Sequence, residues 1–97
     1  MAKGYWVSVY RAVADRARLA AYDELAGSAV RAGGGRVLSR DGRLVAHEAA
    51  TAERVVLIEF DSFDLAVAAY ESQAYQQALA TLSDAAERDF RIVEGVD

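Results

Sequence analysis

The stretch IEFDSFDLAVAAYESQAYQQALA, residues 58–80, contains the end of a strand and two helix starts separated by a break. Its apolar residues keep helical spacing as far as Tyr70. Ser72 then interrupts this spacing, and serine is a residue type that favours the start of a helix. Ser62 has the same position before the first helix. We therefore predict two short helices that meet in a bend at Ser72. A catalytic role for Ser72 would require a base beside it, and the only histidine, His47, lies in a different segment.

The other elements follow from periodicity and from turn signals. Asp15 is a good cap for a helix that ends at the glycine run 33–35, and Asp41-Gly42 is a strong signal for a two-residue hairpin. The expected elements are strands over 4–11, 36–40, 43–48, 54–60 and 90–96, and helices over 16–32, 63–71 and 73–87. Their order is strand, helix, strand pair, helix, strand. This order predicts an α+β domain with a βαββαβ pattern.

Composition limits the function classes. A chain of 97 residues with 54% hydrophobic residues is expected to form one domain with one core. The net charge of -4 and the pI near 4.9 argue against a nucleic-acid partner, which would require a basic patch. The sequence has no cysteine, no apolar run long enough to cross a membrane and no signal-peptide pattern at its start, so we expect no membrane partner and a cytoplasmic location.

Four segments together resemble the DUF1330 family: KGYW (3–6), GGRVL (34–38), residues 55–79 and RDFRIVEG (88–95). These are small proteins of unknown function in the dimeric α+β-barrel superfamily. The resemblance implies a ferredoxin-like, four-stranded antiparallel sheet with the helices on one face, and a second subunit that covers the other face with the same sheet. The chain departs from the family pattern at three positions: Asp61 and Gln73, where relatives usually have proline, and Leu82, where they often have arginine.

The apolar pattern of the strands supports a homodimer independently of that resemblance. A sheet with one face in water alternates apolar and polar residues. Instead, the strand 55–60 is apolar on both faces apart from Glu59, and Trp6 and Tyr10 oppose valines in the first strand. The helices can cover only one of the two faces. We therefore expect the other to pack on a second copy of the chain.

A candidate ligand site follows from the same alternation. We expect Glu59, Trp6, Tyr10, Arg36 and Arg40 to lie on the face that meets the partner. Arginines bind carboxylates with two parallel hydrogen bonds, and a buried Glu59 could act as a base, so these residues suit a small acidic or phenolic ligand. The simpler interpretation is that Glu59 and an arginine form a structural ion pair. Tyr22, Tyr70 and Tyr75 have core spacing and become site residues only where a cavity opens between helices and sheet.

Two functional classes remain. The chain is either a small-molecule binder, with a cofactor-independent enzyme as a special case, or a non-catalytic dimer that senses a ligand or binds other proteins. His47 beside Glu48 is weak evidence for a metal, because other ligands do not cluster with it in the sequence. The glycine run follows a helix, unlike the glycines of dinucleotide-binding motifs, so no cofactor is predicted.

Overall fold

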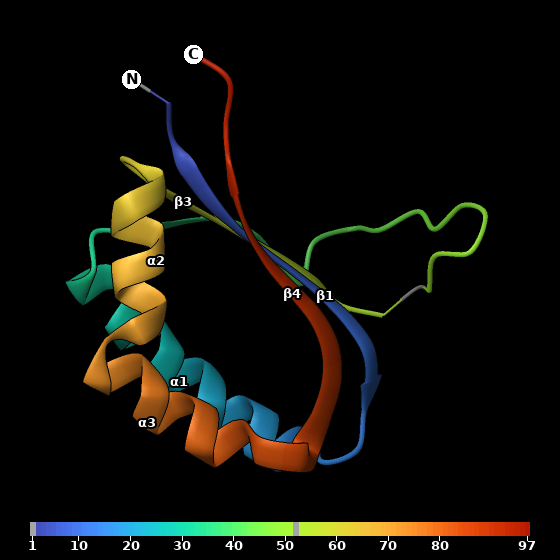
Figure 1. Cartoon of the computed structure of the whole chain (residues 1–97). Helices are drawn as coiled ribbons and strands as arrows, with labels where there is room; N and C mark the ends of the chain where they lie inside the picture. The colour runs from blue at the N-terminus through green and yellow to red at the C-terminus, as the bar shows by residue number, and fades with distance from the viewer. Residues whose placement is uncertain (1, 52) are drawn as a thin grey trace.

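The fold is a four-stranded antiparallel sheet with helices on one face, as a computed structural model describes it for residues 2–51 and 53–97 (Figure 1). The spatial order of the strands is β2-β3-β1-β4. The elements in chain order are β1 (Gly4–Val13), α1 (Arg16–Ala32), β2 (Arg36–Arg40), β3 (Val55–Phe60), α2 (Phe63–Glu71), α3 (Gln73–Leu82), a 3₁₀ turn (Ser83–Ala85) and β4 (Ala86–Glu94). The predicted α+β, ferredoxin-like architecture is confirmed.

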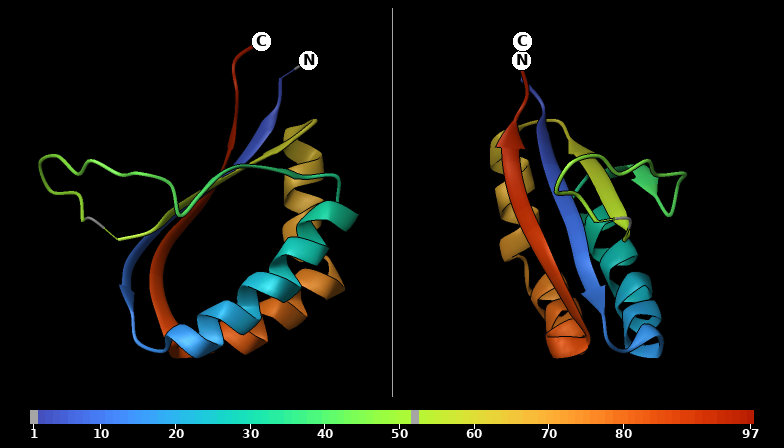
Figure 2. Two further views of the ribbon diagram at one scale, coloured as in Figure 1. Left: turned by 180° about the vertical axis from the view of Figure 1, so that it is seen from behind. Right: turned by 90° about the vertical axis from the view of Figure 1, so that its right-hand side faces the viewer.

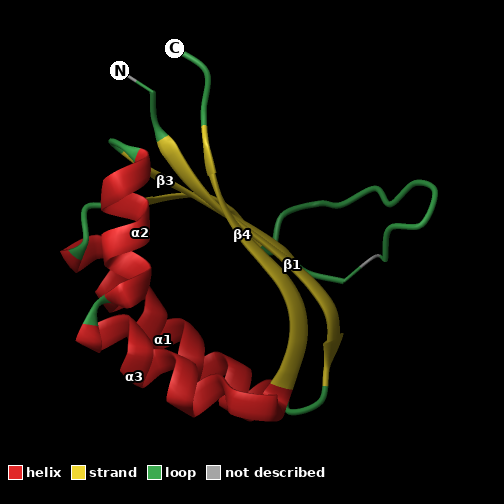
Figure 3. Ribbon diagram, in the orientation of Figure 1, coloured by secondary structure: helices red, strands yellow, loops and turns green. Residues whose placement is uncertain are grey.

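The bend between α2 and α3 lies at Ser72, as predicted (Figure 3). Its Oγ accepts the backbone N–H of Tyr75 at 3.3 Å and donates to the carbonyl of Ala69 at 2.7 Å, so one side chain ends α2 and begins α3. Asp15 and Ser62 cap α1 and α2 in the same way. None of the helices in the described part of the chain is long and apolar enough to cross a membrane.

The core lies between the sheet and the helices, with Trp6 of β1 at its centre. Trp6 is 2% exposed, and its indole N–H donates to the carbonyl of Ala66 in α2 at 2.9 Å. Its ring lies 4.7 Å from that of Tyr75, 5.1 Å from that of Phe60 and 5.3 Å from that of Phe90, measured between centroids. Such aromatic contacts fix the distance between helices and sheet.

The opposite face of the sheet carries no helix, as two views of the ribbon show (Figure 2). Val7 of β1 pairs with Leu57 of β3 at the middle of this open face, and both remain half-buried. Tyr5, Val9 and Val55 extend the same apolar surface along the two central strands. The expectation of two apolar sheet faces is therefore met, and one of them is uncovered in a single chain.

The predicted hairpin at Asp41-Gly42 is wrong. Residues 41–51, 53 and 54 have no strand structure and belong to a long connection that extends away from the helices (Figure 1), and β2 pairs with β3 instead. Asp41 has a φ of 58°, so the chain does turn there, but Val45 is 77% exposed. Residues 43–48 are exposed and cover no part of the core, whereas the apolar strand β3 does. The pairing of β2 with β3 is therefore favoured by burial.

The last strand begins earlier than predicted. Helix α3 ends at Leu82, where Ser83 adopts a φ of 44°, and β4 starts at Ala86 instead of Phe90. The reason is that β1 also extends further, to Val13, and pairs with Ala86. The four additional residues place Arg88 inside the sheet, and this residue is central to the site described below.

Candidate functional site

The structure separates the predicted site residues onto the two faces of the sheet. Glu59 pairs with Tyr5, whereas Trp6 pairs with Ile58, so Glu59 lies on the open face and Trp6 on the helix face. Tyr10 shares the helix face with Trp6 and is 1% exposed. The prediction that Glu59 lies beside Trp6 and Tyr10 is therefore wrong. A shift of one residue in register exchanges the faces of a strand, and the register cannot be read from one strand alone.

The two predicted arginines are separated as well. Arg36 pairs with Glu59, and Arg40 pairs with Val56, with a β-bulge between them in the middle of β2. Residues four apart in a regular strand share a face, but the extra residue of a bulge reverses this relationship. Arg36 consequently lies on the open face, and Arg40 lies on the helix face, where it lines a cavity.

On the open face, Arg36 and Glu59 form an ion pair at the surface. Glu59 Oε1 accepts from Arg36 Nε at 3.1 Å and Nη2 at 3.0 Å, and the hydroxyl of Tyr5 donates to Oε2 at 3.4 Å. Arg36 also donates to Asp61 at 3.0 Å, and this hydrogen bond holds the pKa of Asp61 below its usual range. The geometry is that of the structural ion pair that the sequence offered as the simpler interpretation of Glu59.

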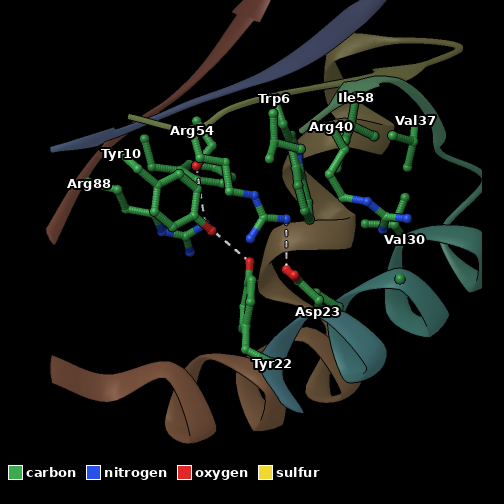
Figure 4. A pocket seen from close by; sticks show the side chains of 15 residues that line it. Trp6, Tyr10, Tyr22, Asp23, Val30, Val37, Arg40, Arg54, Ile58 and Arg88 are labelled. Carbon is green, nitrogen blue, oxygen red and sulfur yellow. Dashed lines mark hydrogen bonds and ion pairs between the residues drawn. The ribbon is translucent and has the colours of Figure 1, made fainter. Parts of the chain in front are cut away.

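On the helix face, a cavity of about 40 Å³ lies between the sheet and α1 (Figure 4). Most of its wall is apolar, and the larger apolar and aromatic side chains that line it include those of Trp6, Tyr10, Val30, Val56, Ile58 and Phe90. Its polar groups are Ser8, Tyr22, Asp23, Arg40, Arg54 and Arg88. A mainly apolar wall with a few converging polar groups is the usual form of a small-ligand site.

Arg88 of β4 organises the polar end of this cavity. Its Nη1 donates to the hydroxyls of Ser8 at 3.3 Å and Tyr22 at 3.1 Å, and its Nη2 donates to the hydroxyl of Tyr75 at 2.9 Å. Its guanidinium carbon lies 4.8 Å from the centroid of Phe90 and 5.2 Å from that of Tyr22, so aromatic rings flank the cation. Among residues 2–51 and 53–97, no carboxylate lies within ion-pair distance of Arg88.

The two tyrosines of this cluster bind each other as well as Arg88. Their hydroxyl oxygens are 2.6 Å apart in the interior. Burial raises the pKa of Tyr22, an effect to which Tyr75 adds and which Arg88 opposes, and burial likewise raises the pKa of Tyr75. Both phenols are therefore neutral at physiological pH. Although burial opposes its charge, the pKa of Arg88 is also raised, because the phenols place their oxygens against the guanidinium.

The cluster has more hydrogen-bond donors than acceptors. Arg88 brings only donors, and Ser8, Tyr22 and Tyr75 bring one O–H each. When one phenol donates to the other, the receiving hydroxyl accepts from both its neighbours and its own proton lacks a partner. Either phenol can be the donor in this pair; where Tyr75 donates, the spare proton is that of Tyr22, which lines the cavity and can offer the proton to a group bound there. The missing partner is an oxygen atom that only accepts hydrogen bonds, such as that of a carboxylate or a phenolate.

Two further arginines line the same cavity. Arg54, the residue before β3, forms an ion pair with Asp23 of α1 at 2.9 Å, and its guanidinium carbon lies 5.1 Å from the ring centroid of Tyr10. Arg40 has no side-chain hydrogen bond or ion pair within the described part of the chain. The cavity thus has three guanidinium groups around it and one carboxylate, that of Asp23.

A sign of the role of Arg88 is present in the sequence, although Arg88 was not among the predicted site residues. In RDFRIVEG, Arg88, Phe90 and Ile92 occupy every second position and so share one face of the strand. An arginine therefore lies on an apolar face. Tyr22 and Tyr75 were expected to matter only beside a cavity between helices and sheet, and Tyr22 lines such a cavity. The position of Arg54 beside the cavity could not be predicted from the sequence, because it depends on the path of the long connection that precedes β3.

The remaining candidates lie elsewhere. His47 and Glu48 are exposed in the connection 41–54. Within residues 2–51 and 53–97, no group of three potential ligands is arranged to hold a metal ion. Leu82, which replaces an arginine common among relatives, is 4% exposed and packs in the core near the end of α3.

Comparisons with known proteins agree with this fold. The family described as a domain of unknown function (DUF1330) matches residues 3–96. The methylated form of RPA0582, a protein of unknown function from Rhodopseudomonas palustris, is similar with a TM-score of 0.73 and 15% identity, over 99% of this chain and 82% of its own. Comparison with curated protein sequences yields no match.

Two further solved structures are similar over nearly their whole length. One, from Nitrosomonas europaea, is described as a candidate antibiotic biosynthesis monooxygenase, with a TM-score of 0.59, 19% identity and complete coverage of both chains. The other, a dimeric ferredoxin-like protein of unknown function from Thermobifida fusca, has a TM-score of 0.55 and 13% identity, over 98% of this chain and 92% of its own. At these identities the similarity shows the fold alone.

Proposed function

The chain belongs to the DUF1330 family, and from this premise and the geometry of the cavity we propose that it is a homodimer that binds a small acidic or phenolic metabolite. The observation that carries the proposal is the cluster around Arg88, a partly buried cation with three hydroxyl partners and, among the residues that the structure describes, no carboxylate partner. A buried charge is ordinarily paired, because burial without a partner is costly. A ligand anion supplies the missing charge and the missing acceptor together.

The shape of the cavity supports a small, flat ligand. Trp6, Tyr10 and Phe90 provide aromatic walls, and Arg88 binds at one end. The volume of about 40 Å³ limits the ligand to a compact molecule unless side chains move. An aromatic or short-chain acid has both the apolar body and the charged end that this wall requires.

An enzymatic form of the proposal uses the same groups. Donors that converge on one oxygen stabilise negative charge that develops there during a reaction, and the neutral phenol of Tyr22 can supply a proton. The Nitrosomonas europaea neighbour is described as a candidate monooxygenase, which is an analogy of fold. The alternative is a dimer that binds its ligand without chemistry. It is favoured by the absence of a carboxylate or histidine next to Arg88 among the described residues.

The homodimer is proposed from the open face of the sheet. Val7 and Leu57 lie at its middle without any helix to cover them, and Val93 at its edge is 41% exposed. A two-fold axis would place the same surface of a second copy against it. The neighbour from Thermobifida fusca, which shares the fold, is described as dimeric.

The test uses benzoate and 4-hydroxybenzoate as probes of the cavity. Trp6 is the only tryptophan of the chain, so its fluorescence reports occupation, and a ligand at a hundred times its Kd stabilises the fold by about 2.7 kcal/mol. We expect Arg88→Met to weaken binding by about ten-fold or more, since a charge-assisted pair is lost. Arg91→Met, on the open face of the same strand, is the matched control and should bind normally. Equal binding by Arg88→Met, or the absence of any response from the wild type, would refute the proposal.

A further inference from the structure

Gly27 lies in the middle of α1 although nothing in the fold requires a glycine there. Glycine inside a helix is destabilising relative to alanine, because glycine loses more conformational freedom on folding. A Cβ atom on Gly27 would contact only Nη1 of Arg31, at the ordinary distance of 3.5 Å, whereas one on Gly33 would lie 2.8 Å from the Cβ of Ala69. Among the glycines that the structure describes, only Gly34 has a positive φ. Neither close packing nor backbone conformation therefore explains Gly27.

Gly27 lies where two hollows of the protein meet. The inner hollow is the cavity with Arg88 at its polar end. The outer one is a surface depression of about 430 Å³ that extends over α1 and the end of β2. Three residues line both hollows, and we call the boundary that they form the neck: Asp23, Gly27 and Arg40. A side chain at position 27 would project into this neck.

An ion pair closes the neck on its sheet side. Arg54 Nη2 lies 2.9 Å from Asp23 Oδ1, and Figure 4 shows the two side chains meeting between the sheet and α1. Only 9% of the Arg54 side chain is exposed. Its Nε lies 3.2 Å from Asp41 Oδ1 yet makes no hydrogen bond, because the geometry of the contact is poor. The guanidinium of Arg54 thus lies between two carboxylates, those of Asp23 and Asp41, at the wall of the cavity.

We infer that the ligand of the cavity enters past Gly27, through the neck that the Arg54–Asp23 ion pair closes. This inference depends on the proposed function for the nature of the ligand. The guanidinium of Arg40, which has no ion-pair partner within the described part of the chain, contacts the anion first, although the outer hollow also carries the carboxylates of Asp23, Glu24 and Asp41. Arg54 then exchanges Asp23 for the anion, which moves on to the donors around Arg88. Gly27 leaves the space that this path needs, and the size of residue 27 sets which ligands pass.

The first test needs no ligand. Acrylamide, a small neutral quencher, is added to the wild type, Gly27→Phe and Gly27→Leu, and the quenching of Trp6 fluorescence is measured. Ser28→Phe is the matched control, because it places the same side chain on the neighbouring, exposed position of α1. We expect quenching in both Gly27 variants to fall to about half of the wild-type value or less, as a blocked entrance requires, while Ser28→Phe quenches like the wild type. Equal quenching in all four proteins would overturn the inference.

The second test measures association with benzoate by stopped-flow fluorescence. We expect Gly27→Phe to slow association by about ten-fold or more, with an unchanged melting temperature, and Asp23→Asn to accelerate it, because the ion pair that closes the neck is weakened. Association that is equally fast in Gly27→Phe would place the entrance elsewhere. A wild type that is quenched through the neck but never binds either benzoate probe would refute the proposed function and leave the entrance in place.

Discussion

The hydroxyl of Tyr22 on α1 lies 2.6 Å from that of Tyr75 on α3, and Arg88 of β4 donates to both. Three elements that are distant in the sequence therefore meet at one polar point inside an otherwise apolar layer. Such a network rigidifies a core when its members are satisfied, and it is costly when a partner is removed. The same point is the polar end of the cavity, so we expect stability and the proposed ligand binding to depend on the same side chains.

The first prediction concerns alkaline pH. The pKa values of Tyr22 and Tyr75 are raised in the folded protein above the ordinary 10.0, chiefly by burial. The unfolded state therefore releases these protons at lower pH than the folded state does. The stability that the neutral phenols contribute is complete below about pH 10 and is lost as the pH rises beyond it. Urea unfolding across this range should show a falling free energy of unfolding.

In Tyr22→Phe the free energy of unfolding should decrease less steeply with rising pH, because one of the two buried phenols is absent. At neutral pH the same variant should lose about 1–3 kcal/mol, since a buried donor of Arg88 loses its acceptor. Tyr5→Phe on the open face is the control, and its free energy of unfolding should decrease with rising pH as that of the wild type does. If the free energy of unfolding of Tyr22→Phe decreased with pH as steeply as that of the wild type, the buried phenol of Tyr22 would not be a cause of this decrease.

The second prediction concerns Ser72, whose hydroxyl both accepts from the N–H of Tyr75 and donates to the carbonyl of Ala69. Ser72→Ala should lower the free energy of unfolding by about 0.5–2 kcal/mol. Ser28→Ala, at an exposed position inside α1, should have little effect. Affinity for benzoate should stay the same in both variants. If Ser72→Ala lost binding at full stability, Ser72 would have a chemical role instead.

The third prediction separates the two faces of the sheet. Glu59→Gln removes the charge that faces Arg36 on the open face, while the cavity lies on the other face. We expect the variant to bind benzoate with unchanged affinity. Its dimer should dissociate into monomers more readily than that of the wild type, as measured by sedimentation velocity. Reduced ligand affinity in a protein that remains dimeric would restore Glu59 as a site residue.

The fourth prediction tests the homodimer. Val7→Lys places a charge at the middle of the open face, where desolvation on association would be costly. The wild type should sediment as a dimer at micromolar concentration and Val7→Lys as a folded monomer. Val96→Lys carries the same change at a position that is 97% exposed near the C-terminus, and it should remain dimeric. A monomeric wild type would reject the dimer outright.

The sequence predicts those parts of the fold that depend on local chemistry. Periodicity located the helices, and the cap of Ser72 located the bend, because capping involves residues three positions apart. Glu59 was placed on the wrong face because its orientation relative to Trp6 depends on the register between two distant strands. The separation of Arg36 from Arg40 was missed because a bulge leaves no clear mark in the sequence.

The bulge in β2 has a consequence for how copies of the chain can associate. β2 is an edge strand, with β3 as its only neighbour in the described sheet. A regular edge offers a row of unpaired backbone groups to any other chain and so invites open-ended polymers. The bulge at Leu38 twists and interrupts that row, and the flanking Arg36 and Arg40 add charge to it. Growth of the sheet from this edge into a fibre is thereby disfavoured.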